Sequence, residues 1–153
     1  MTHNAPAGAT AKRAGPLSRW LARRGGALHG FMYRRGMARR MGKLQVILLT
    51  TTGRKTGRPQ TVPLNGVPEG DGFVVIGSAG GSDFDPAWWL NLVANPNASI
   101  RVNDRVISVR MEPVTDPSER RRLWDNIVAS MGRYAAYEKK AKRVIPLGLL
   151  RPV

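Results

Sequence analysis

The order of hydrophobic and polar positions in the middle of the chain is typical of β-strands joined by tight turns. Runs of apolar and β-branched residues alternate with short segments rich in Gly, Asn and Asp, which favour turns. These turn segments include Glu69-Gly70-Asp71-Gly72 and Asn103-Asp104. The pattern predicts strands near residues 45–52, 60–67, 72–78, 98–103 and 105–114.

Helical patterns lie between and after these strands. Asp85-Pro86 has an N-cap residue followed by a proline at the first helical position, and predicts a helix that runs to about Ala94. Asp116-Pro117 predicts the start of a second helix in the same way. A short helix that carries Tyr134 and Tyr137 is expected after it.

The last apolar run, Val144-Ile145-Pro146-Leu147, predicts a final edge strand or an extended packing segment, because proline is tolerated at a sheet edge. Strands in this order, with helices interposed, do not fit the regular alternation of a parallel sheet. The sequence therefore predicts an α+β fold, mainly β, in which a small barrel is decorated with helices. This domain is expected to span residues 43–153.

The N-terminal part of the chain has a different pattern. Residues 1–15 are rich in Ala, Gly, Thr and Pro without periodicity, which predicts a disordered tail. Residues 16–42 are expected to form a basic amphipathic helical segment, weakened at Gly25-Gly26. Its apolar residues recur at helical spacings, at Leu17, Trp20, Leu21, Leu28, Phe31 and Met32.

Composition adds a strong charge bias to this picture. The chain of 153 residues has a net charge of +15, and residues 1–43 contain no Asp or Glu. Such a segment either stays solvated or meets an anionic lipid, a nucleic acid or an anionic ligand. Packing of the segment on an anionic membrane and packing on the domain are both open interpretations. The chain has no secretory signal pattern and is expected to be cytoplasmic, with peripheral contact at the inner face of the plasma membrane as the membrane alternative.

Two kinds of chemistry are disfavoured by the residue types present. The chain has no cysteine, and its two histidines, His3 and His29, both lie in the N-terminal segment. We therefore expect no metal site and no catalytic histidine in the folded domain.

The most distinctive segment joins the first two expected strands. Two glycines and three cations, Arg54, Lys55 and Arg58, follow the run Thr50-Thr51-Thr52. Cations and exposed backbone N–H groups in a glycine-containing turn can bind a phosphate or a carboxylate. The segment lacks the Gly-Lys-Ser/Thr ending of a P-loop. A plain basic surface turn is the alternative.

Further candidates follow along the chain. The glycine-rich segment 77–82 could approach a flat ligand closely, and Ser78 adds a hydroxyl and an N–H group. Trp88 is expected on a more polar helix face than Trp89, where it could form the wall of a ring-binding pocket. Tyr134 and Tyr137, three residues apart, share one helical face. The alternatives are an ordinary loop at 77–82, core packing for Trp88 and half-buried packing for the two tyrosines.

Several of these motifs, in this order, resemble the deazaflavin-dependent nitroreductase family, which are actinobacterial reductases, including quinone reductases, that use reduced coenzyme F420. The resemblance covers roughly residues 40–147. It rests on Leu-Leu-Thr-Thr-Thr-Gly-Arg-Lys-Thr-Gly at 48–57, Thr61-Val62-Pro63-Leu64, the loop at 77–82, Pro86-Ala87-Trp88-Trp89-Leu90-Asn91-Leu92, Ala94-Asn95-Pro96, and Tyr134 and Tyr137 before Ile145-Pro146.

The resemblance implies a split β-barrel like that of flavin-nucleotide-binding proteins, and a cofactor with a deazaflavin ring, a phosphate and a polyglutamate tail. FMN is the weaker alternative. The implied reaction is hydride transfer from the cofactor to a quinone, an activated enone or a nitro compound, with Ser78, Tyr134 and Tyr137 as catalytic residues. The implied cofactor-binding residues are Arg54, Lys55, Thr56, Arg58, Pro63, Ser78, Ala79, Gly80, Gly81, Ala87, Trp88 and Asn91.

The sequence departs from the family pattern at the acceptor end. Trp89-Leu90 replaces the usual Tyr followed by His or Gln, Met131 stands in place of a first tyrosine, and Asn65 stands where an aromatic residue is sometimes found. The competing interpretations are a basic module that binds nucleic acid or anionic lipid, and a protein that holds deazaflavin or FMN without turnover. We expect no specific nucleic-acid partner, because the aromatic residues are not interleaved with the basic cluster.

Overall fold

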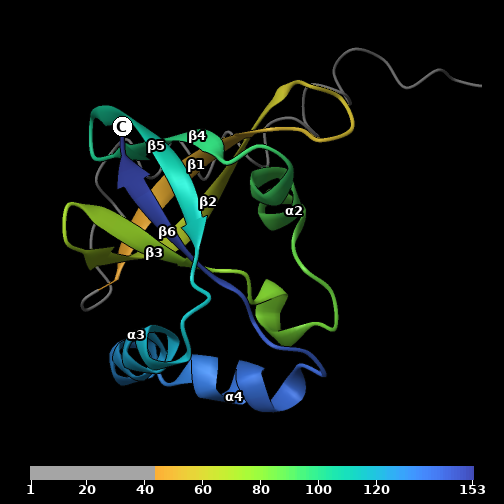
Figure 1. Ribbon diagram of the computed structural model, residues 1–153, viewed down its shortest axis with the longest axis vertical. Helices are drawn as coiled ribbons and strands as arrows, with labels where there is room; N and C mark the ends of the chain where they lie inside the picture. The colour runs from red at the N-terminus through yellow and green to blue at the C-terminus, as the bar shows by residue number, and fades with distance from the viewer. Residues whose placement is uncertain (1–43) are drawn as a thin grey trace, which may run out of the picture.

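The computed structural model describes residues 44–153, so the predicted tail at 1–15 and the predicted helical segment at 16–42 lie outside the described residues. Six strands and three α-helices follow one another along this part of the chain (Figure 1). In chain order the elements are β1 (Gln45–Thr52), β2 (Pro59–Glu69), β3 (Gly72–Ile76), the 3₁₀ turn η1 (Ala79–Gly81), α2 (Ala87–Ala94), β4 (Asn97–Val102), β5 (Arg105–Pro113), α3 (Pro117–Ser130), α4 (Arg133–Lys140) and β6 (Leu147–Pro152).

The six strands close into one antiparallel barrel in the order β1-β2-β3-β6-β5-β4. The five strands predicted from the sequence are confirmed, with β3 ending at Ile76 rather than at residue 78. Of the two alternatives for 144–147, the final edge strand is wrong, because β6 starts at Leu147 and lies between β3 and β5. Residues 144–146 instead form a packing segment outside the sheet, with Ile145 1% exposed. Pro146 cannot donate to a ladder, and the paired strand starts only after it.

Two apolar clusters flank the barrel wall, as the alternation of side chains along a strand requires. Ile47, Leu49 and Val75 belong to the cluster that fills the barrel and that both tryptophans of α2 enter. Val74 and Ile76, on the opposite face, belong to the cluster that α3 and α4 cover. In Figure 1, α3 and α4 lie together on one side of the barrel, and α2 lies at another.

The hairpin of β1 and β2 extends beyond the barrel, as the yellow ribbon in Figure 1 shows. β1 pairs with β4 only through Leu48–Thr50, whereas its pairing with β2 continues to Thr52 and Pro59. On its other side, β2 pairs with β3 only from Gly66 onward. The barrel wall is therefore split along the first half of β2, and Pro63 lies in this half, where a missing donor is tolerated.

The two Asp-Pro pairs behave differently. Asp116 caps α3 as predicted, and its carboxylate accepts a hydrogen bond of 2.9 Å from the backbone N–H of Glu119. The prediction that Asp85 caps α2 is wrong, because the N-cap residue is Pro86. Asp85 instead forms an ion pair of 2.6 Å with Arg143.

The predicted faces of α2 also need correction. Trp88 and Trp89 are both buried, at 9% and 6% exposure, so the core-packing alternative for Trp88 holds and the more polar face does not. Val93, on the same helix, is 60% exposed. The helix has only eight residues and contacts β1 as well as the barrel interior, so it is buried on more than one face. Within residues 44–153, no helix is both long and apolar enough to cross a membrane.

Candidate active site

The cationic loop between β1 and β2 is a closed turn. The N–H of Gly53 donates to the carbonyl of Arg58 at 2.8 Å, and the N–H of Gly57 donates to the carbonyl of Gly53 at 2.7 Å. Gly57 has φ of 68°, a conformation that a side chain disfavours. The side chain of Thr56 accepts from the N–H of Arg58 at 3.2 Å. This turn therefore exposes Arg54, Lys55 and Arg58 together at the end of the projecting hairpin.

The side chain of Asn91 fastens this hairpin to α2. Its oxygen accepts from the backbone N–H of Arg54 at 3.1 Å and from the Arg54 guanidinium at 3.4 Å. Its nitrogen donates to the hydroxyl of Thr51 at 3.1 Å and to the side-chain oxygen of Gln60 at 3.0 Å. Asn91 is 1% exposed, and these four bonds use both donors and both lone pairs of its amide. Its contacts therefore favour holding the hairpin over touching a cofactor directly.

The glycine-rich segment turns sharply at η1. Ala79, Gly80 and Gly81 all have positive φ, at 44°, 64° and 81°. A Cβ on Gly81 would lie 3.1 Å from the Cα and carbonyl oxygen of Tyr137, so the backbone of this loop packs directly on α4. Ser78, just before the turn, is buried. The loop predicted from glycine content is thus a fixed turn against the helix that carries the tyrosines.

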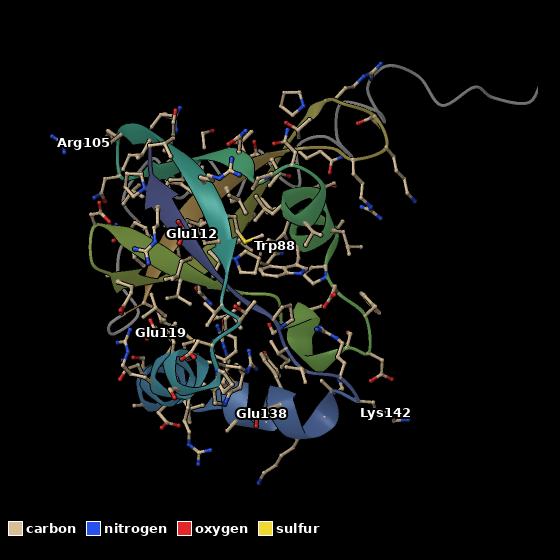
Figure 2. All side chains as sticks on the ribbon, in the orientation of Figure 1. Trp88, Arg105, Glu112, Glu119, Glu138 and Lys142 are labelled. Carbon is tan, nitrogen blue, oxygen red and sulfur yellow. The ribbon has the colours of Figure 1, made fainter. Side chains whose placement is uncertain are left out.

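The two tryptophans of α2 point in different directions. Their rings are edge-to-face, with an interplanar angle of 83° and centroids 6.0 Å apart. Trp89 reaches the barrel wall, where its ring would lie 2.9 Å from a Cβ on Gly148 of β6. Trp88 lies between α2 and η1 in the view of Figure 2. This placement keeps Trp88 as the candidate for a ring-binding wall.

Tyr134 and Tyr137 form an edge-to-face pair with centroids 5.5 Å apart. Tyr134 is 5% exposed and Tyr137 is half-buried. The amide nitrogen of Asn65 donates to the Tyr134 hydroxyl at 3.4 Å. Because that oxygen accepts this bond, its own proton remains free to be donated elsewhere. Asn65, where the sequence departs from the family pattern, therefore bonds one of the two tyrosines predicted for the site.

Two of the predicted cofactor-binding residues are exposed on the surface. Pro63 is exposed on β2, opposite Leu48, and Ala87 is exposed at the start of α2. Sequence reasoning missed Gln60, which bonds Asn91, and Arg143, which bonds the loop at 77–82. Both are ordinary polar residues in the sequence, and only the fold brings them to the site.

The ion pairs that shift pKa values involve residues outside the candidate site. Hydrogen bonding from Arg122 lowers the pKa of Glu119, and Glu119 and Glu69 in turn raise the pKa of Arg122. A hydrogen bond to Glu112 raises the pKa of Arg151. These pairs tie α3 to β2 and β6 to β5 on the surface. Residues 44–153 contain no cluster of acidic and histidine side chains that could hold a metal.

These features fit a class of small barrel proteins in which a flat ring could lie beside a short helix and anionic groups could meet a cationic hairpin. The cations fit a phosphate and carboxylates, because Arg54, Lys55 and Arg58 are exposed together on one turn. The buried Trp88 and the turn with two glycines fit a planar ring.

The chain belongs to the F420H(2)-dependent quinone reductase family, whose model matches residues 28–152. An F420H(2)-dependent quinone reductase of Mycobacterium tuberculosis H37Rv is 36% identical over 146 residues, which cover 88% of this chain and 97% of that protein. A solved F420H2-dependent reductase of the FDR-A type has 33% identity and a TM-score of 0.63, covering 69% of this chain and 93% of that one. The chain is thus an F420H2-dependent reductase, and the family implies coenzyme F420 as its cofactor.

The fold is also found in more distant proteins. A putative pyridoxamine 5'-phosphate oxidase from Listeria innocua has 14% identity and a TM-score of 0.50, covering 70% of this chain and 82% of that one. At this identity the likeness concerns the fold alone, and it confirms the predicted split β-barrel.

Proposed function

We propose that this protein transfers a hydride from reduced coenzyme F420 to a quinone, with activated enones and nitro compounds as further acceptors. The observation that carries the proposal is the bond of Asn91 to Arg54, because it joins the cationic hairpin to the helix of Trp88. The anion-binding end and the ring-binding end of the site therefore belong to one rigid unit. The quinone as first acceptor follows the names of the family and of its mycobacterial relative.

In this proposal the hairpin binds the phosphate and the polyglutamate tail. Arg54, Lys55 and Arg58 supply charge-assisted hydrogen bonds, and Thr56 adds a hydroxyl. Asn91 sets the direction of Arg54 and leaves Lys55 and Arg58 exposed to the ligand. Pro63 and Ala87 offer apolar surface beside this path.

Trp88 and the backbone of Ser78, Ala79, Gly80 and Gly81 would hold the ring of the cofactor. When bound in its reduced form, the cofactor supplies the hydride, and the protein orients the two reactants and excludes water. Ser78 donates a hydrogen bond near the reacting centre. Tyr134 and Tyr137 hold the acceptor, and one of their hydroxyls gives its oxygen the proton that completes the reduction to a hydroquinone.

The direct test follows oxidation of reduced F420 by menadione with purified protein. We expect turnover that saturates in both reactants, and loss of turnover when excess oxidised F420 competes. A protein that binds F420 and reduces no quinone, enone or nitro compound would be a cofactor carrier. A protein that instead holds FMN through purification, and ignores F420, would contradict the proposal.

A peripheral position at an anionic membrane is part of the same proposal for the segment at 16–42. Its support is the sequence alone, where apolar residues and arginines share a helical pattern without any acidic residue. Such a position would bring the site close to lipid-soluble quinones.

A further inference from the structure

Arg143 lies after α4 and reaches across to the glycine-rich turn. Its Nε donates to the carbonyl of Ser82 at 2.9 Å, and its Nη2 donates to the carbonyls of Gly77 at 2.9 Å and Ser78 at 3.2 Å. Its Nη1 bonds the Asp85 carboxylate at 2.6 Å. The side chain is 15% exposed. One guanidinium therefore holds both ends of the turn and the segment that leads into α2.

The carbonyl contacts fix the direction of two backbone N–H groups. In a trans peptide the C=O and the following N–H point in opposite directions, and the described chain has no cis peptide. Arg143 bonds the carbonyls of Gly77 and Ser78, and the Ser78 carbonyl also accepts from the N–H of Gly81 at 2.8 Å. The N–H groups of Ser78 and Ala79 therefore point to the other side of the turn. Two neighbouring N–H groups aimed alike are a donor pair for a ligand oxygen.

The turn has a backbone that needs such a restraint. Ala79 has φ of 44°, which is unfavourable for a residue with a side chain, and Gly80 and Gly81 continue in positive φ. Conformations of this kind persist only where the surroundings impose them. Arg143 on one side and the Tyr137 backbone on the other supply those surroundings.

Charge alone does not account for these contacts. Asp85 neutralises Arg143, so the pair adds no net charge to attract an anion. The planar guanidinium spans three carbonyls and a carboxylate at once, which the compact ammonium of a lysine cannot do.

We propose that Arg143 is a positioning residue, which sets the Ser78 and Ala79 N–H groups toward the oxygen-bearing edge of the bound ring or acceptor. This inference rests on the proposed function. Arg143 acts through the turn and touches neither reactant.

The test compares Arg143→Lys, Arg143→Gln and Asp85→Asn with the control Arg151→Gln, which breaks an exposed ion pair with Glu112 on the barrel surface. With F420 and menadione both saturating, kcat should fall about 10- to 100-fold for Arg143→Lys and Arg143→Gln, as expected for misplaced reactants. Asp85→Asn should show a smaller loss, and Arg151→Gln none. If Arg143→Lys keeps the full kcat, Arg143 contributes only charge and the inference fails.

A second readout uses the ligand-free protein. Amide hydrogen exchange in the peptide that covers residues 77–85 should be about tenfold faster or more in Arg143→Gln than in wild type, since the turn opens more readily. Exchange in the barrel strands should not change. Unchanged exchange at 77–85 would overturn the inference even if turnover falls. A wild-type protein that ignores F420 would instead overturn the proposed function, and the exchange result would still decide whether Arg143 holds the turn.

Discussion

Asn91 shows how a single buried amide can join several elements of a fold. Its four bonds join the loop, β1, β2 and α2, and the residue is 1% exposed. Replacing the side chain would leave the buried hydroxyl of Thr51 and the exposed amide of Gln60 without this partner, and would free the hairpin to move. The site therefore depends on this residue through geometry rather than through contact.

Asn91→Ala should lower the free energy of unfolding by about 1–3 kcal/mol, because buried hydrogen-bonding groups lose their partners. It should also weaken F420 binding, since Arg54 loses its restraint. Urea unfolding and fluorescence polarisation of F420 measure the two effects. Asn126→Ala, at an exposed position on α3, is the matched control and should change neither. An Asn91→Ala protein with wild-type affinity would show that the hairpin needs no anchor.

Trp88 and Trp89 allow a paired test of the ring-binding wall. Trp88→Phe and Trp89→Phe each remove a similar volume from the same buried cluster, so both should destabilise the fold. The expected loss of stability is about 1–3 kcal/mol for each, which is roughly half the cost of replacing a buried Trp by Ala. Only Trp88→Phe should raise the dissociation constant for F420, because Trp89 reaches the barrel wall. Equal affinities in the two variants would remove the proposed role of Trp88.

The tyrosines can be tested by removing only their hydroxyls. Tyr134→Phe or Tyr137→Phe should lower kcat with menadione at least about tenfold if that hydroxyl transfers a proton. F420 affinity should stay at the wild-type value in both. A double Phe variant that keeps the wild-type kcat would leave the acceptor without a protein proton donor and would contradict this part of the mechanism.

At the level of elements, the two Asp-Pro pairs show what a sequence can and cannot predict. Asp116 caps its helix as local chemistry requires, whereas Asp85 is drawn to Arg143, 58 positions further along the chain. The strands and turns were predictable because side-chain alternation and turn residues are local signals. Contacts between distant parts of the chain determine the place of β6 inside the barrel, the burial of Trp88 and the bonds of Arg143. No local sequence pattern predicts such contacts.

Helix α3 offers a pH-dependent contact. The hydrogen bond from Arg122 lowers the pKa of Glu119 below its ordinary 4.5. A carboxyl with a lowered folded-state pKa adds stability above its unfolded value and loses it as the pH falls through the folded-state pKa. Wild type should therefore have a higher Tm than Glu119→Gln at pH 7, and the difference should shrink as the pH falls below 4.5 and through the lowered folded-state pKa. Asp104→Asn, in the β4–β5 turn, is the control. A constant difference across this range would assign the effect to another cause.

For the whole molecule, the cofactor site and the basic N-terminal segment are separate questions. The barrel and the hairpin consist of residues that the structure describes, while the segment at 16–42 lies outside them, although the family match begins within it at residue 28. Its membrane contact stays a prediction. Full-length protein should sediment with anionic vesicles and lose this property when residues 1–40 are deleted, with F420 binding retained. Full-length protein that stays in the supernatant at low salt would oppose the prediction.

The measurement that tests the central claim most directly is a titration of oxidised F420 with purified protein, followed by fluorescence polarisation at several salt concentrations. We predict saturable binding that weakens as salt is added, and a large loss of affinity with a shallower salt dependence when Arg54 and Lys55 are both replaced by Gln. Arg105→Gln with Arg110→Gln, at two exposed positions of β5, removes the same charge and should bind as wild type. Absence of binding at moderate salt, or equal loss in both double variants, would contradict the claim that the β1–β2 hairpin holds the anionic part of coenzyme F420.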